Sequence, residues 1–206
     1  MKSLRVPIAL LLMAPLLFAA CGGKRPPNHY YLLGAPASQE EAAASPSTGS
    51  EGLRVGVKAL HVDPPYDRDS IVYRVGADSP EVGFYAYHLW AAPLSRMLPG
   101  VVATAFEGAE GIGTIEPVVP GQSYAAYVTG RVLAFEEVDL PEGQRVRISI
   151  SLRLQLANGD ELWTGQVSGE SGLQTDGVAD IVDAMRALLG ELLQEARLEL
   201  ASALNS

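Results

Sequence analysis

A regular alternation of apolar and polar residues between Gln144 and Ala157 constrains the fold of this chain more than any other feature. The apolar positions are Val146, Ile148, Ile150, Leu152, Leu154 and Leu156, and the polar ones are Arg145, Arg147, Ser149, Ser151, Arg153 and Gln155. Because successive side chains of a strand point to opposite faces, this pattern predicts a long strand with one buried and one solvated face. Asn158-Gly159-Asp160 then predicts a tight hairpin into a further strand at Glu161–Gly169.

Other short segments are rich in the residues that favour strands. We predict strands at Tyr30–Leu33, Leu53–Val62, Ser70–Val75, Val82–Tyr85, Ile112–Glu116 and Ser123–Glu137. Residues 34–52, between the first two of these strands, are rich in Ala, Ser, Pro, Gly and Glu and have little apolar surface to bury. This composition predicts a flexible loop inside the domain.

Two segments show helical spacing of apolar residues. The first begins at Tyr87 and continues to Ala105, with Trp90 expected on its buried face, and Pro99-Gly100 is predicted to kink or end it. The second covers Val178–Leu204, with apolar residues at i, i+3, i+4 and i+7. Its polar face is mainly acidic, which favours packing on the sheet over an anionic membrane surface. Its apolar stripe could also serve a subunit interface, so a homo-oligomer is left open.

The order of elements is strands, helix, strands, helix. It predicts an α+β layered domain over residues 30–206, with a mixed, mainly antiparallel sheet covered by two main helices. The chain has 1 cysteine, Cys21, so no internal disulfide can form. The fold must therefore be held together by its hydrophobic core.

The N-terminal segment is typical of an export signal. Basic residues are followed by an apolar stretch of about fifteen residues and then by small residues before Cys21. The stretch is shorter than the roughly 20 residues of a membrane-spanning helix. Phe18-Ala19-Ala20-Cys21 resembles a bacterial lipoprotein lipobox.

This resemblance implies a signal peptide at 1–20 and a lipidated tether at 21–29. The Cys21 thiol would carry a diacylglyceryl group and its amine an N-acyl chain such as palmitate, and two or three chains anchor a protein firmly. The alternative is an ordinary secreted protein in which Cys21 is incidental.

Charge excludes one class of partner. The full chain has a formal net charge of -9, and removal of residues 1–20 takes away two basic residues and no acidic one. Nucleic-acid binding depends on clustered Lys and Arg, so we expect no nucleic-acid partner.

No motif predicts an enzyme. We expect no catalytic residue, no metal and no cofactor other than the covalent lipid. The three histidines have no zinc-ligand spacing, three nearby aspartates lack the full ligand series of an EF-hand, and one glycine-rich segment does not match a phosphate loop. These residues are His29, His61 and His88; Asp63, Asp67 and Asp69; and Gly108–Gly113.

Several stretches in order resemble the auxiliary lipoproteins of ABC-type and MCE lipid-transport systems, the PqiC-like family. They are the lipobox followed by Tyr30-Tyr31-Leu32-Leu33, the run Tyr66–Arg74, the run His88–Leu94 with its Trp-Ala-Ala-Pro-Leu, and the final strand, strand, helix order. The family usually has Leu where this chain has Tyr66. The 34–52 segment also looks longer than usual for the family.

The resemblance implies an accessory lipoprotein rather than an enzyme. It would be anchored on the periplasmic face of the outer membrane and would dock an MCE-domain protein or ABC transporter component. Gly22 fits this location, because Asp directly after the lipidated Cys commonly signals inner-membrane retention. The alternative is a structural or assembly lipoprotein of another cell-envelope machine.

The residues Tyr66, Arg68 and Arg74 are candidates for a partner-binding surface. In this interpretation the two arginines pair with acidic groups on the partner. The alternative places the aromatic residues of this region, such as Tyr73, in the core.

Overall fold

The computed structural model describes residues 25–34, 52–173 and 177–205, which form nine strands and two helices. The strands are β1 (His29–Tyr31), β2 (Leu53–Val57), β3 (His61–Val62), β4 (Ser70–Val75), β5 (Val82–Trp90), β6 (Ile112–Pro117), β7 (Ala126–Leu140), β8 (Gly143–Leu156) and β9 (Glu161–Gly172). The helices are α1 (Leu94–Phe106) and α2 (Val178–Leu204). Cys21, the signal segment and nearly all of the predicted loop at 34–52 lie outside the described residues.

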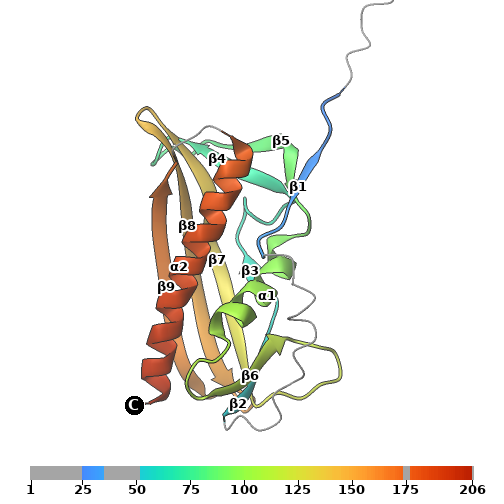
Figure 1. Ribbon diagram of the computed structural model, residues 1–206, viewed down its shortest axis with the longest axis vertical. Coiled ribbons are helices and arrows are strands. Elements are labelled where there is room, and N and C mark those ends of the chain that lie inside the picture. The colour runs from blue at the N-terminus through green and yellow to red at the C-terminus, as the bar shows by residue number, and fades with distance from the viewer. Residues whose placement is uncertain (1–24, 35–51, 174–176, 206) are drawn as a thin grey trace, which may run out of the picture.

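All the strands join one mixed sheet, with β7 at its centre (Figure 1). One edge of β7 pairs with β8 in a long antiparallel ladder, and β8 pairs with β9 in the same way. The other edge of β7 is shared by β2, β3 and β4, which pair with it in parallel one after another along its length. Beyond β4 the sheet continues through β5 to β1. The predicted α+β fold with a mixed sheet is confirmed.

Both helices cover the same face of this sheet (Figure 1). The alternation that predicted β8 is confirmed, because Val146, Ile148, Ile150, Leu152 and Leu154 are all buried. The apolar stripe of α2 lies over them and is buried within the chain: Ile181, Val182, Met185, Leu188, Leu189, Leu192, Leu193, Ala196 and Leu200. This stripe therefore belongs to the core and does not supply a subunit interface.

The segment around Tyr87 differs from its prediction. Residues 82–90 form strand β5, and α1 begins only at Leu94, after Pro93. Trp90 is buried as expected, but it lies at the end of a strand. Its ring meets that of Phe135 edge-on, with the ring centroids 5.7 Å apart. The helical spacing was misleading because β5 lies between two partner strands, and its pairing with β1 and β4 outweighs the local pattern.

Two smaller predictions differ in part from the structure. Helix α1 does not end at Pro99-Gly100 but continues to Phe106, with Pro99 inside the helix and without a backbone N–H to donate to the carbonyl four residues earlier. The strand predicted at Leu53–Val62 is divided into β2 and β3 by residues 58–60. Leu60 in this break is buried, so the interruption serves packing.

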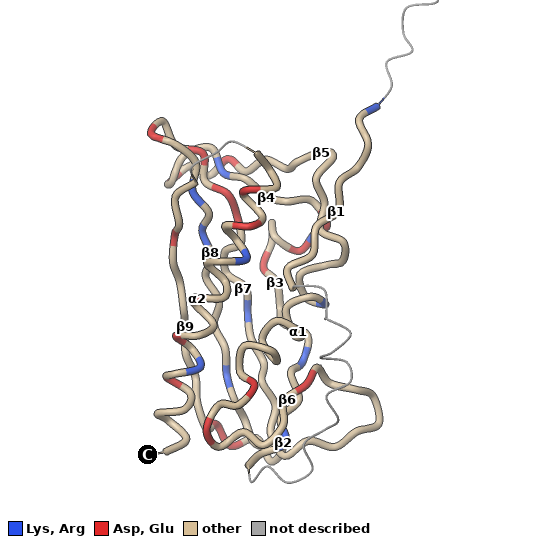
Figure 2. The backbone as a smooth tube through the Cα atoms, viewed as in Figure 1, with Lys and Arg blue, Asp and Glu red and all other residues tan. Residues whose placement is uncertain are grey.

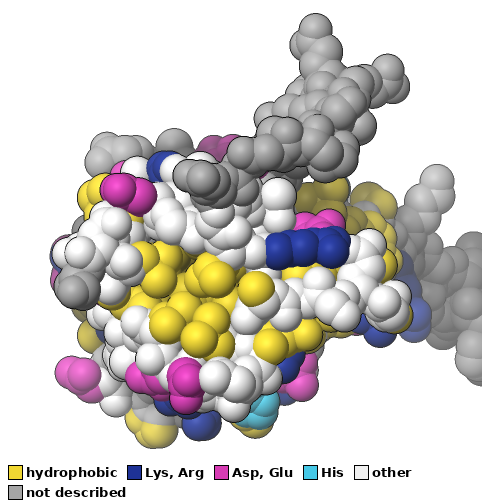
Figure 3. Space-filling view, turned by 90° about the horizontal axis from the view of Figure 1, so that it is seen from below, with side chains coloured by type: hydrophobic (Ala, Val, Ile, Leu, Met, Phe, Trp, Pro, Cys, Tyr) yellow, Lys and Arg dark blue, Asp and Glu magenta, His cyan; other side chains and the backbone are white. Residues whose placement is uncertain are grey.

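The structure also bears on membrane contact. None of the helices in the described residues is long and apolar enough to cross a membrane. Apolar side chains do gather on the end of the molecule seen from below in Figure 3.

Candidate functional site

Two adjacent glutamates, Glu136 and Glu137, lie in the interior of β7. Each is only 1% exposed, and they are the buried charged residues of the described chain. Because they are neighbours on a strand, their side chains point to opposite faces of the sheet. Each carboxyl therefore needs its own set of partners.

Glu136 is held by three side chains from three different elements. Arg74 on β4 donates from Nε to Oε1 at 2.9 Å and from Nη2 to Oε2 at 3.0 Å, which is a bidentate pair. The Tyr66 hydroxyl, from the β3–β4 turn, donates to Oε2 at 2.8 Å. Arg147 stands directly opposite on β8 and places Nη1 3.6 Å from Oε1. Figure 2 shows acidic and basic residues close together where β4, β7 and β8 meet.

The electrostatics of this Glu136 cluster favour a structural role. Burial and the hydrogen bond to Glu136 raise the pKa of Tyr66 to about 12, so its hydroxyl stays a donor. The hydrogen bond to Glu136 also raises the pKa of Arg74, which stays charged. With two guanidinium groups and a phenol around one carboxylate, the cluster joins the β3–β4 turn to three strands.

The structure brings together two of the three residues predicted for partner binding. Tyr66 is buried, and the Arg74 side chain is 18% exposed and engaged with Glu136. Arg68 lies apart from them on the surface, with its guanidinium carbon 3.7 Å from the centroid of the Phe84 ring. Its Nε donates to the Pro65 carbonyl at 2.7 Å. Of the three predicted residues, Arg68 is therefore the one that faces solvent, and it does so stacked on Phe84.

Sequence reasoning missed Glu136 and Phe84. A signal for Glu136 did exist, because two consecutive acidic residues inside an apolar strand cannot both lie on a single solvated face. No comparable signal marks Phe84, since its neighbour Arg68 is brought to it only by the pairing of β4 with β5.

Glu137 faces the other side of the sheet, towards an aromatic group. The Tyr85 hydroxyl donates to its Oε2 at 2.7 Å. The ring of Tyr73 meets that of Tyr85 edge-on at 5.3 Å. Tyr73 can lie there because its partner across the strands is Gly83, where any side chain would collide with the ring. Burial, with a smaller contribution from Asp139, raises the pKa of Glu137, while the hydrogen bond from Tyr85 opposes the rise.

Replacing Glu137 with glutamine should stabilise the domain at neutral and basic pH. A carboxyl with a raised pKa in the folded state favours folding when protonated, so stability falls as pH rises from its ordinary value of 4.5 through the folded value. Glutamine keeps an acceptor for Tyr85 and removes the buried charge. We expect a gain of about 1–2 kcal/mol near neutral pH in denaturant titrations. The gain should shrink towards zero below pH 4.5, the ordinary pKa of the carboxyl. A gain that is equal at neutral and acidic pH would contradict this account.

A histidine pair extends the aromatic group to β1. His29 and His88 stack with centroids 5.0 Å apart, and the Tyr31 hydroxyl lies 2.8 Å from Nδ1 of His88. Burial, and then the neighbouring His29, lowers the pKa of His88. Over the described ranges, no group of three or more His, Cys, Asp or Glu side chains could hold a metal ion. The pair holds β1 on β5.

Comparison with known proteins places the chain among transport-associated lipoproteins. The family described as "ABC-type transport auxiliary lipoprotein component" matches residues 31–196. No curated protein matches the chain.

Two solved structures share the fold. A protein from Xanthomonas campestris has a TM-score of 0.63 at 16% identity, over 77% of this chain and 90% of that one. An uncharacterised protein has a TM-score of 0.63 at 18% identity, over 84% of this chain and 99% of that one. The PelC dodecamer from Paraburkholderia phytofirmans has a TM-score of 0.46 at 11% identity, over 73% of this chain and 89% of that one.

Proposed function

The chain belongs to the family of ABC-type transport auxiliary lipoprotein components, and from this premise we propose that it is a non-catalytic docking subunit of a lipid-transport system. Lipid on Cys21 anchors it to the periplasmic face of the outer membrane. From there it meets an MCE-domain protein or another periplasmic component of an ABC transporter. The observation that carries the proposal is the family match, which begins within β1 and ends within α2.

Features of the sequence support the finer parts of this proposal. The segment Phe18–Cys21 fits a lipobox, and Gly22 follows it in place of the Asp that commonly signals inner-membrane retention. The buried acidic residues are engaged by tyrosine and arginine side chains from within the chain, which favours a scaffold over a catalyst.

Co-purification tests the proposed partner. The lipidated chain is crosslinked in cells, purified and examined for the proteins attached to it. An MCE-domain protein or a transporter subunit is the expected result. Recovery of a different envelope machine, in cells that express an MCE protein, would instead favour the assembly role.

Arg68 with Phe84 is the partner contact within this proposal. The stacked pair is exposed, and a guanidinium held over an aromatic ring is pre-ordered to meet an acidic group. In this arrangement Tyr66 and Arg74 act indirectly, since they fix the β3–β4 turn that carries Arg68.

Changing Arg68 to glutamate should weaken association with the crosslinked partner by about tenfold or more while leaving the thermal unfolding midpoint nearly unchanged. The matched control is Lys58→Glu, which reverses a charge elsewhere on the chain. The Lys58 Nζ lies over the Tyr127 ring, 4.3 Å from its centroid. Comparable losses for both variants would show a general charge effect. Unaltered binding by a folded Arg68→Glu variant would remove Arg68 from the contact.

A further inference from the structure

Strand β1 leaves one of its edges without a partner in the described chain. It is the first strand of the sheet order and pairs only with β5. The carbonyl of Tyr31 accepts a hydrogen bond from the Ala91 amide at 2.8 Å, so the backbone groups of Tyr31 face β5. In a parallel ladder the neighbouring residue points the other way, which directs the amide and carbonyl of Tyr30 to the free edge.

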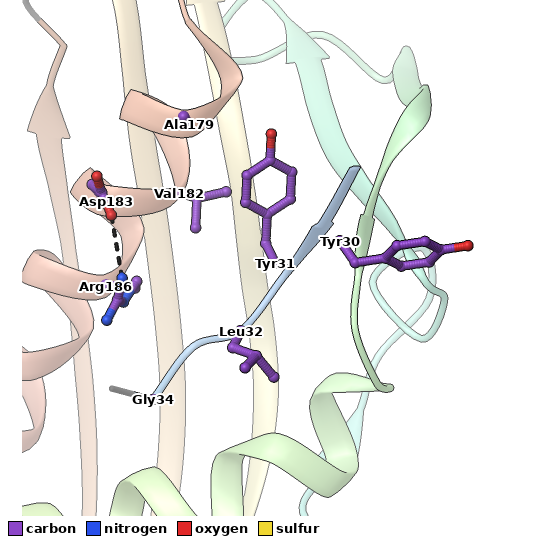
Figure 4. Close-up of a pocket in the computed structure, with 8 residues that line it drawn as sticks. All are labelled: Tyr30, Tyr31, Leu32, Gly34, Ala179, Val182, Asp183 and Arg186. Carbon is purple, nitrogen blue, oxygen red and sulfur yellow. Dashed lines mark hydrogen bonds and ion pairs between the residues drawn. The ribbon is translucent and has the colours of Figure 1, made fainter. Parts of the chain in front are cut away.

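This free edge borders a groove of about 310 Å³ between β1 and the first turns of α2. Figure 4 shows the Tyr30 ring directed away from α2 and the Tyr31 ring directed towards it, so Tyr31 lines the groove with its side chain and Tyr30 with its backbone. The facing wall is formed by Ala179 and Val182 of α2, with Asp183 beside them. An edge strand opposite a helix with an apolar wall is the geometry in which extended peptides add to a sheet.

Two charged side chains of α2, Asp183 and Arg186, line the groove. Arg186 donates from Nε to the Leu33 carbonyl at 3.2 Å and pairs with Asp183 through Nη1 at 3.3 Å. The Asp183 side chain is still 71% exposed. Asp180, one turn earlier, is exposed and has no basic partner within ion-pair distance in the described part of the chain. The full chain is acidic as well, with a formal net charge of -9.

We propose that this groove binds an extended segment of a partner protein, which adds as a strand to β1 and carries basic residues between apolar ones. Its backbone would pair with that of Tyr30, and its apolar side chains would lie against Ala179 and Val182. Its basic side chains would meet Asp183, which lines the groove, and Asp180, which precedes it on α2. The exposed carboxylates of Asp180 and Asp183 and the acidic charge of the chain favour a basic strand over an acidic one. Binding in this groove requires neither the lipid anchor nor the transport role.

A change at Tyr30 can separate the free edge from the paired one. Tyr30→Pro removes an amide that points into the groove and puts a ring in its place, while the bonds of Tyr31 to β5 are kept. Tyr30→Ala is the matched control, because it shortens the side chain and retains the amide. As a second blocking variant, Ala179→Arg fills the groove from an exposed position on α2. Its control is Leu198→Arg, on the same helix at a residue that is 64% exposed.

The probe is a short end-blocked peptide that alternates lysine and valine, added to the full mature chain in detergent. We expect binding by fluorescence anisotropy and slower hydrogen exchange at the amide of Tyr30. Tyr30→Pro and Ala179→Arg should each weaken binding by about tenfold or more, and the two controls by less than about threefold. An analogue with glutamate in place of lysine, and one N-methylated on alternate residues, should also bind at least about tenfold more weakly.

Several results would overturn the proposal. One is the absence of binding up to millimolar peptide, and another is equal binding by the acidic analogue. A third is unchanged binding by the folded Tyr30→Pro and Ala179→Arg variants. If the chain alone is a dimer that Tyr30→Pro converts to a monomer, a second copy occupies the edge and the assignment to a partner strand is wrong.

Discussion

Replacing Arg74 with methionine should destabilise the domain by about 3 kcal/mol, towards the lower end of the roughly 3–5 kcal/mol seen when one partner of a buried ion pair is removed. The Glu136 carboxylate is only 1% exposed and would lose both hydrogen bonds of its bidentate partner. Arg147, at 3.6 Å, would offset part of the loss. Urea titration at neutral pH measures the change in the free energy of unfolding.

A double variant separates the lost ion pair from a simple packing defect. Glu136→Gln combined with Arg74→Met removes the buried carboxylate that has lost its partner and keeps an acceptor for the Tyr66 hydroxyl. It should recover most of the stability that the single variant loses. A single variant within about 1 kcal/mol of the original chain would show that the Glu136 cluster does not hold the strands together.

Replacing Cys21 with serine is expected to have the largest effect in cells. A serine hydroxyl is a far weaker nucleophile than a cysteine thiol at neutral pH, so no thioether to diacylglycerol forms. Each lost methylene removes about 0.8 kcal/mol of membrane affinity, and the loss of all the acyl chains should release the protein from the membrane fraction. Labelled palmitate should be incorporated into the original chain and not into the variant.

Lys24→Ser is the matched control, since it changes a nearby residue and keeps the thiol. Its product should stay in the membrane fraction and incorporate palmitate. A Cys21→Ser variant that remained with the membrane after a carbonate wash would contradict anchoring through this residue. Such a result would leave the family membership in place and would remove the anchor from the proposed function.

The sequence predicted those elements whose local pattern and tertiary environment agree. Strand β8 alternates because α2 covers one of its faces and solvent the other. The stripe of α2 matches the surface that it buries. The segment 87–90 was predicted wrongly because its apolar spacing fits a helix, whereas pairing with β1 and β4 decides its structure.

The candidate site could be predicted only in part, for a related reason. Tyr66 and Arg74 were singled out, but their common partner Glu136 is about sixty to seventy residues away in the sequence. Only the register of β4 and β8 against β7 brings the charges together, and no local pattern encodes that register. The free edge of β1 was likewise invisible, because it depends on which strands remain unpaired in the complete sheet.

The parallel attachment of β1 has a mechanical consequence. Through the hydrogen-bonded ladders of the sheet, a pull on β1 is passed to β5 and then to β4 before it reaches the long central strand β7. The pairing of β1 with β5 is three residues long, and so is the pairing of β4 with β7. The side chains of Arg74 on β4 and Glu136 on β7 also link these two strands through two hydrogen bonds. Under tension β1 would therefore separate from β5 first. The ion pair between Arg74 and Glu136 would keep β4 attached to β7.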